Sequence, residues 1–241
     1  MKSALIMGAS GDIGAGIAQE LAESGWSLYL HYHTDDKSIE RQLQIYRLSF
    51  PKQDFFGIKL DMTDELGIEA FVGNIFQLDA VIFSSGFTTF QLLTDVTSKT
   101  MDDMWAVHVK TPLLLLQKLQ TKLAYSGSGR VVFISSIYGE SGSSMEVIYS
   151  TTKGAQLAFV KAYSKEVASQ GITVNAISPG AIETKMNADF SVTELAELRE
   201  EIPVGRMGRI SEISFWVHQL LNPRSAYLTG QSIVVSGGWL R

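Results

Sequence analysis

Residues 7–14 read MGASGDIG, and they join the apolar run Ser3–Met7 to a helical pattern over 13–24. Glycines at 8, 11 and 14 allow a tight turn and a close approach of the backbone to a pyrophosphate at the helix N-terminus. A strand, a glycine turn and a helix in this order favour the first unit of a nucleotide-binding α/β fold. A plain strand-to-helix turn is the alternative for this motif taken alone.

Short β-rich runs and helical patterns alternate along the rest of the chain. Strands are predicted near 3–7, 27–32, 55–60, 79–83, 131–135, 172–177 and 232–235, and helices near 13–24, 36–49, 64–76, 100–124, 149–169 and 211–221. This alternation predicts α/β architecture: one doubly wound parallel sheet, a Rossmann fold, in a single domain over 1–241. The stretch 182–201 is predicted to be a substrate lid with a helix at 193–201.

Composition limits the classes of function. The net charge of −5 argues against nucleic acid as a main partner. There is no cysteine, which excludes disulfides, thiol nucleophiles and cysteine-ligated metals and is compatible with the cytoplasm. The longest pure aliphatic run, 113–116, is far too short to cross a membrane.

Tyr149 and Lys153 are spaced so that they share one face of a predicted helix. A nearby ammonium group would lower the pKa of the phenol, which could then exchange a proton with a carbonyl oxygen. Ser136 follows the apolar run 130–134, so its hydroxyl could hydrogen-bond the same oxygen. The alternative for the pair alone is two ordinary residues on a helix surface.

The end of the second predicted strand bears on the choice of nucleotide. Tyr32 stands where enzymes that prefer NAD commonly have an acidic residue, so a 2′-phosphate is not repelled and NADPH is expected, with NADH possible. Asp61 ends the third strand, where it could accept from adenine or cap the next helix. The weaker candidates for a phosphate contact are Ser10, His31, His33 and Lys37. His31 and His33 have no evident third ligand, so no metal is predicted.

Over its whole length the chain resembles the short-chain dehydrogenase/reductase family, in the subgroup of bacterial 3-oxoacyl-carrier-protein reductases. The motifs that carry the resemblance are the glycine turn Gly8 to Gly14, Asp61, Ser136, Tyr149, Lys153, Asn175, Pro179-Gly180, Thr184, and Tyr227 to Gln231 followed by Gly237-Gly238.

The resemblance implies a role for each residue of the site. Tyr149 would be the acid/base, Lys153 would hold the nicotinamide ribose and tune Tyr149, and Ser136 would orient the carbonyl. The backbone of Ile182 and Thr184 would bind the carboxamide. Nucleotide contacts are implied for Gly8, Ser10, Gly11, Asp12, Ile13, Gly14, Tyr32, Asp61, Met62, Ser84, Ser85, Gly86, Tyr149, Lys153, Pro179, Gly180, Ile182 and Thr184. The family is usually tetrameric, so a homotetramer is expected.

Three positions depart from the family pattern. Asp12 replaces a glycine of the turn, where a carboxylate can cap the helix and weaken nucleotide binding. Residues 83–86 read FSSG in place of Asn-Asn-Ala-Gly. His108 replaces a catalytic asparagine that holds a water in the proton path to lysine. Histidine can do the same, and a buried histidine satisfied by backbone is the alternative.

The choice of ketone depends on charge. Gly127 and Gln170 stand where the acyl-carrier reductases have arginines that dock an acidic carrier, whereas Glu140 and Glu146 lie in the loop that lines the pocket and favour a cationic substrate. Residues 135–142 and 149–156 resemble the branch of elongation factor P 5-aminopentanone reductases, which act on modified elongation factor P. The alternatives are reduction of a 3-oxoacyl chain on acyl carrier protein, general reduction of small ketones, and a nucleotide-binding sensor without turnover.

Overall fold

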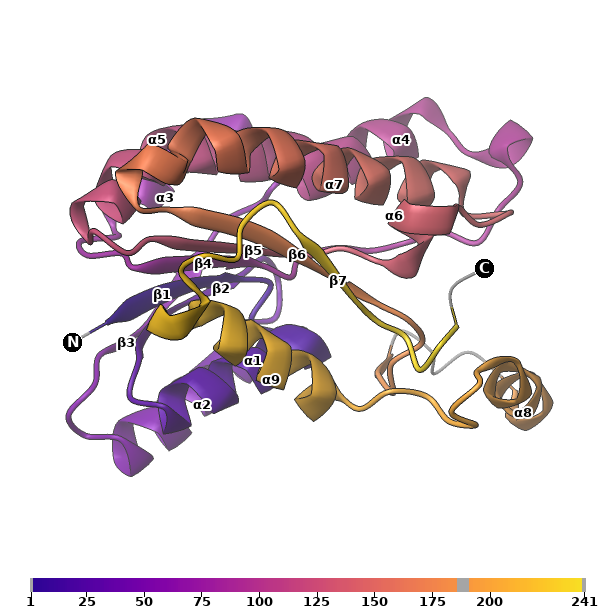
Figure 1. The fold of residues 1–241 in the computed structure, drawn as a ribbon, viewed down its shortest axis with the longest axis horizontal. Helices are drawn as coiled ribbons and strands as arrows, with labels where there is room; N and C mark the ends of the chain where they lie inside the picture. Colours follow the sequence, from indigo (N-terminus) through magenta and orange to yellow (C-terminus); the bar gives the residue numbers. More distant parts are fainter. Residues whose placement is uncertain (1, 186–190, 240–241) are drawn as a thin grey trace.

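The computed structural model describes residues 2–185 and 191–239, and Figure 1 shows helices packed on both faces of one sheet. The strands follow the order β3-β2-β1-β4-β5-β6-β7, and every neighbouring pair is parallel. Their bounds are β1 (Ser3–Met7), β2 (Ser27–Tyr32), β3 (Phe55–Lys59), β4 (Ala80–Phe83), β5 (Arg130–Ile134), β6 (Thr173–Pro179) and β7 (Ser232–Val235). The predicted doubly wound fold is confirmed.

The helices divide between the two faces of the sheet. One face carries α3 (Ile68–Gly73), α5 (Thr111–Tyr125) and α7 (Val147–Val167); the other carries α1 (Asp12–Glu23), α2 (Asp36–Ser49) and α9 (Ile210–Leu221). The remaining α-helices are α4 (Ser98–Trp105), α6 (Ile137–Ser141) and α8 (Val192–Glu201). Short 3-10 turns occur at η1 (Glu65–Gly67), η2 (Leu93–Asp95), η4 (Ala168–Gln170) and η6 (Pro223–Ser225).

The central strands are buried on both faces, which explains their continuous apolar sequences. Every residue of β1, β5 and β6 is buried. Phe83 of β4 stacks on Phe133 of β5 with ring centroids 4.7 Å apart. Complete burial of a side chain such as Phe133 stabilises the fold by about 1.5–3 kcal/mol.

The predicted helix over 100–124 is interrupted. A π-helical turn, η3 (Ala106–Lys110), separates α4 from α5. Pro112 has no N–H to donate to the carbonyl four residues earlier, that of His108. The side chain of Gln156 in α7 donates to this carbonyl instead, at 2.7 Å. The carbonyl that Pro112 leaves unpaired is therefore satisfied from another helix, and the His108 ring contacts Thr152 of α7.

The expected helix of the lid forms as α8, which Ser191 and Glu194 begin with a reciprocal capping box. Residues 186–190 of the predicted lid lie outside the described residues. In the described part of the chain, no helix combines the length and the apolar character that a membrane span requires.

Candidate active site

The glycine turn between β1 and α1 is shaped by two very close backbone approaches. Gly8 has φ +81°, and a Cβ on it would lie 2.7 Å from the backbone nitrogen of Ser85. A Cβ on Gly14 would lie 2.1 Å from the carbonyl oxygen of Gly8. No side chain fits at either position, so the turn presents bare backbone at the N-terminus of α1.

His31 holds this turn from the neighbouring strand. Its Nδ1 accepts a hydrogen bond from the N–H of Gly8 at 2.9 Å, and its Nε2 donates to the carbonyl of Leu60 at 3.0 Å. Burial lowers the pKa of the ring to about 4, so His31 is neutral at neutral pH. The prediction that His31 is a candidate for a 2′-phosphate contact is therefore wrong, because the ring is buried and both nitrogens are engaged. A histidine inside an otherwise apolar strand is the sequence feature that could have indicated this role.

Asp12 does not cap α1, contrary to the expectation for a carboxylate in the turn. Gly11 is the N-cap residue, and Asp12 is the first residue of the helix. Its carboxylate accepts from the backbone N–H of Lys185 at 2.6 Å and lies 3.6 Å from the Lys185 ammonium. Asp12 thus joins the nucleotide turn to the segment after β6.

Asp61 is held in a turn beyond β3. Its carboxylate accepts from the backbone and hydroxyl of Thr63 at 2.9 and 2.7 Å, and these bonds lower its pKa. His33 Nε2 lies 3.5 Å from the same carboxylate. The helix-cap alternative for Asp61 is wrong, because Asp64 accepts from the N–H of Leu66 and caps η1.

The remaining predicted nucleotide residues lie at the carboxyl ends of the strands. Tyr32 ends β2 and is half-buried, and Ser84 follows β4 and donates to the carbonyl of Met7 at 2.7 Å. The hydroxyl of Ser85 is buried and has no hydrogen-bond partner among the described residues. Ser10 and Gly86 lie in the turns after β1 and β4, Ile13 is the second residue of α1, and the carbonyl of Met62 accepts from Thr111 at 2.6 Å.

The segment after β6 is fixed by backbone pairing. Pro179 ends the strand, and the N–H of Gly180 donates to Val235 of β7 at 3.0 Å. Ile182 is buried and forms an isolated parallel bridge with Gly208. Thr184 follows two residues later and is half-buried.

Ser136, Tyr149 and Lys153 meet near the carboxyl end of β5. Ser136 is the N-cap residue of α6 and accepts from the N–H of Tyr138 at 3.1 Å. Tyr149 and Lys153 are one turn apart in α7, and the Lys153 ammonium nitrogen lies 5.4 Å from the centroid of the phenol ring. The same nitrogen donates to the carbonyl of Ile134 at 2.8 Å. Three residues that are separated in the sequence therefore lie close together in the folded protein.

Burial controls the protonation of this cluster. It raises the pKa of Tyr149 far above the usual value near 10, and a hydrogen bond with Ser136 offsets part of the rise. Burial also lowers the pKa of Lys153 to about 7. The expectation that Lys153 lowers the pKa of Tyr149 is not met in this arrangement, since desolvation is the largest effect on the phenol and raises its pKa. Tyr149 keeps its proton at neutral pH.

His108 is buried behind Tyr149, and both of its ring nitrogens have protein partners. Nε2 accepts from the N–H of Phe87 at 3.1 Å. Thr152 donates its hydroxyl proton to the carbonyl of Tyr149 at 2.8 Å, so it accepts from His108 Nδ1, also at 2.8 Å. Burial holds the pKa of His108 well below its usual range, so the ring is neutral. In this geometry the ring positions α7 and leaves neither nitrogen for the water expected from the family pattern.

The two glutamates between β5 and α7 have different surroundings, since Glu140 lies in α6 and Glu146 is the N-cap residue of α7. Glu140 accepts hydrogen bonds from Ser178 at 3.3 Å and from Ser232 at 2.6 Å, which places it against β6 and β7. Glu146 immediately precedes α7, is half-buried, and accepts from the hydroxyl of Thr88 at 2.8 Å. Burial raises the pKa of Glu146, and its charge in turn raises that of Tyr149. Of the two glutamates, Glu146 is the one whose charge raises the pKa of the reactive phenol.

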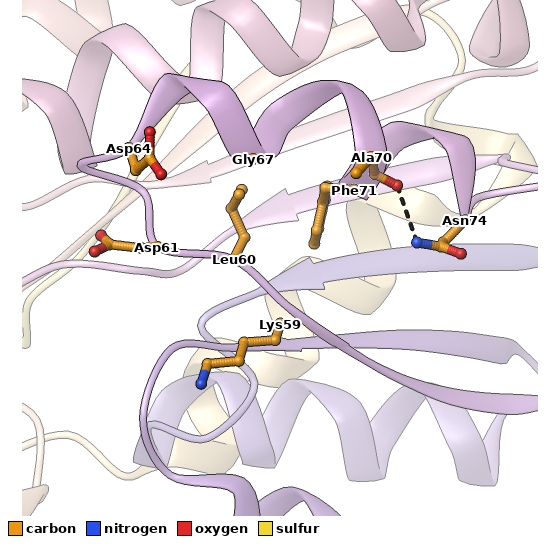
Figure 2. Close-up of a pocket in the computed structure, with 8 residues that line it drawn as sticks. All are labelled: Lys59, Leu60, Asp61, Asp64, Gly67, Ala70, Phe71 and Asn74. Atoms are coloured by element: carbon orange, nitrogen blue, oxygen red, sulfur yellow. Dashed lines mark hydrogen bonds between the residues drawn. The ribbon is translucent and has the colours of Figure 1, made fainter.

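A hollow of about 330 Å³ lies apart from this cluster, between the end of β3 and α3. Figure 2 shows Leu60 and Phe71 at its centre, with Asp61 and Asp64 to one side. Its lining contains neither the glycine turn nor Ser136, Tyr149 or Lys153. The hollow is therefore distinct from the reaction site, although it adjoins Asp61.

Comparison with known proteins identifies the family. The family model described as enoyl-(acyl carrier protein) reductase matches residues 8–240. The chain belongs to the short-chain dehydrogenase/reductase family. A Bacillus subtilis (strain 168) relative named uncharacterized oxidoreductase YmfI is 40% identical, with 99% of this chain and 98% of that protein covered. The 3-oxoacyl-[acyl-carrier-protein] reductase FabG of Staphylococcus aureus (strain Mu50 / ATCC 700699) is 30% identical, with 98% and 97% covered.

Two solved structures share the fold. YwfH, an NADPH-dependent reductase involved in bacilysin biosynthesis, has a TM-score of 0.93 at 22% identity, with 100% of this chain and 98% of that chain covered. A blue fluorescent protein from a metagenomic library, solved with NADPH, has a TM-score of 0.90 at 25% identity, with 100% and 98% covered. This protein is thus an oxidoreductase of the short-chain dehydrogenase/reductase type.

Proposed function

We propose that the protein reduces a ketone to a secondary alcohol with NADPH. The observation that carries this proposal is that Ser136, Tyr149 and Lys153 lie together near the carboxyl end of β5. The glycine turn follows the carboxyl end of β1 in the same parallel sheet, so both features lie at one edge of that sheet (Figure 1). The hydroxyl of Ser136 would hold the carbonyl oxygen, and Tyr149 would give that oxygen a proton. The raised pKa of Tyr149 supports this direction, because the phenol is in its protonated form at neutral pH.

The nucleotide site fits the cofactor on the chain's own features. The turn at Gly8 and Gly14 has no room for side chains, and a pyrophosphate can approach its backbone N–H groups closely. The hydroxyl of Ser85, buried and without a partner among the described residues, supplies a further donor beside that turn. Tyr32 places no carboxylate against a 2′-phosphate. Bound NADPH would supply the hydride.

Lys153 is proposed to hold the nicotinamide ribose and to set the protonation of Tyr149. Its pKa of about 7 allows it to gain or lose a proton near neutral pH. Hydrogen bonds that the ammonium donates to ribose hydroxyl oxygens would stabilise its charged form, and that charge would lower the pKa of Tyr149 once the site is assembled. The test is NADPH consumption with a panel of ketones. Nucleotide binding without turnover of any ketone would favour the sensor alternative.

For the substrate, we propose a ketone that also carries an amine, as on modified elongation factor P. Support comes from Glu146, a half-buried carboxylate three residues before Tyr149 in sequence. An ammonium group paired with Glu146 would offset the free-energy cost of removing that carboxylate from water. Glu140 is a weaker candidate than the sequence indicated, because two serine hydroxyls already occupy its carboxylate.

The second candidate is reduction of a 3-oxoacyl chain on acyl carrier protein, which the 30% identity to FabG favours. Against it, Gly127 and Gln170 offer no charge to an acidic carrier, and Gln170 accepts a hydrogen bond from Gln120 at 3.2 Å. A cytoplasmic homotetramer is proposed on the family resemblance, and light scattering would measure its mass.

Side-by-side kinetics separate the two candidates. The change Glu146→Gln should lower kcat/KM on the amine-bearing ketone and spare a neutral ketone, and added salt should weaken the difference. Glu140→Gln is the matched control, because it makes the same change of charge in the same segment between β5 and α7. It should leave the ratio of kcat/KM between the two ketones unchanged. Equal losses on both ketones in Glu146→Gln, or faster turnover of the acyl carrier by the unaltered protein, would reject the aminoketone.

A further inference from the structure

Arg130, the first residue of β5, is a buried cation that has no counter-charge among the described residues. Only 4% of its surface is exposed. Within the described chain, its hydrogen bond runs from Nη1 to the carbonyl of the preceding Gly129, at 2.9 Å, and its buried Nε has no partner there. Burial lowers the pKa of the guanidinium, and no neighbouring charge opposes that effect. Because arginine stays protonated in proteins, the charge needs a partner from elsewhere.

A cavity of about 180 Å³ lies beside this side chain. It is formed where the turn before β5, the η4 turn with the residues that lead into β6, and the loop after η6 meet, at the amino-terminal ends of β5 and β6. In Figure 1 this is the end of the sheet away from α6 and α8. The volume is several times the roughly 30 Å³ that one water occupies in the liquid, so a small polyatomic ion fits.

The lining of the cavity is suited to an anion. Ser128, Thr173 and Thr229, which carry hydroxyl groups, line the cavity together with Arg130, and the lining includes no Asp or Glu. In the described structure, the hydroxyls of Ser128 and Thr173 make no hydrogen bond to another protein group. A guanidinium with nearby hydroxyl donors is the combination that binds tetrahedral oxyanions through charge-assisted hydrogen bonds.

We propose that this cavity is a binding site for a small oxyanion of the phosphate type, held by Arg130 with Ser128 and Thr173. The site is separate from the reaction centre, because it lies at the opposite ends of the strands from Ser136 and Tyr149. Its occupant neutralises the buried guanidinium and so links the turn before β5 to the loop after η6.

The test is thermal unfolding of the full chain in sodium phosphate against sodium chloride at equal ionic strength, with saturating NADP⁺ to occupy the nucleotide site. Phosphate at about ten times its Kd should raise the Tm by roughly 3–5 °C. Arg130→Met should lose this phosphate-dependent rise and keep the response to NADP⁺. Lys52→Met, which removes an exposed positive charge elsewhere, should keep both.

A second pair of variants decides the matter even if Arg130→Met does not fold. Ala226 lines the cavity and is exposed, so longer side chains can be placed there. Ala226→Glu supplies a carboxylate from the chain itself, and it should raise the Tm in chloride and abolish the rise in phosphate. Ala226→Gln should do neither. The proposal is overturned if phosphate and chloride give the unaltered protein the same Tm, or if Ala226→Glu responds to phosphate as Ala226→Gln does.

Discussion

Replacing Lys153 by methionine should stabilise the protein while it destroys turnover. Lys153 is 4% exposed and its pKa is about 7, against an ordinary value near 10.4 for the unfolded chain. Between these two values the unfolded chain binds more protons than the folded protein, so this lysine destabilises the fold as the pH falls below about 10.4. The cost grows until the pH reaches about 7 and is constant below it.

The size of the effect follows from about 1.4 kcal/mol per tenfold change in the proton equilibrium. At pH 8 the cost of Lys153 is about 3 kcal/mol, and at pH 10 it is below about 1 kcal/mol. Methionine fills much the same space but loses the hydrogen bond to the carbonyl of Ile134, worth about 1 kcal/mol. The net gain at pH 8 is about 2 kcal/mol, or roughly 4–8 °C in Tm for a domain of this size.

The assay is thermal unfolding of the nucleotide-free protein and of Lys153→Met from pH 8 to pH 10, with activity measured in parallel. The Tm of the variant should lie above that of the unaltered protein at pH 8, and the two should converge toward pH 10. Lys165→Met, which changes an exposed lysine of the same helix, should show no such convergence. A lower Tm for Lys153→Met at pH 8, or a difference that does not depend on pH, would refute the reasoning.

Four further outcomes are expected. Tyr149→Phe should lower kcat by at least about 100-fold and keep NADPH affinity by calorimetry, since only the proton donor is lost; near-normal turnover would reject the mechanism. Tyr32→Asp should shift the kcat/KM ratio toward NADH by repelling the 2′-phosphate, and an unaltered protein that already prefers NADH would contradict this reading. Asp12→Gly should lower the Kd for NADPH, because a carboxylate leaves the N-terminus of α1; an unchanged Kd would show that Lys185 already neutralises it. His31 has a pKa of about 4 in the folded protein, so on acidification the unfolded chain binds a proton at this residue before the folded protein does. The free energy of unfolding should therefore fall by about 3 kcal/mol as the pH drops from about 6.5 to 4. Chemical denaturation should show a smaller loss in His31→Asn over this range, and equal losses would remove His31 as the cause.

The sequence was sufficient for the order and nearly all the bounds of the strands, because buried parallel strands are continuous apolar runs between turns. It also predicted that Ser136, Tyr149 and Lys153 would lie together. It missed the break at residues 106–110, where Gln156 from a helix far along the chain donates to the carbonyl of His108. The partners of His31 and Glu140 were missed as well, since they come from parts of the chain that are distant in the sequence. Local patterns set the elements, whereas the protonation of buried groups depends on contacts that only the folded chain creates.

Gly127 carries a consequence for engineering. This residue has φ +67°, and its carbonyl oxygen would lie only 2.8 Å from a Cβ on Gly171. An arginine grafted at Gly127 to recruit an acidic carrier would begin with a backbone penalty of about 1–2 kcal/mol before it made any contact. Gln170 is exposed at the end of η4 and has no such constraint. A redesign of this protein toward carrier-bound substrates should therefore start at Gln170 and rebuild the turn around Gly127, since a single substitution there works against the local backbone.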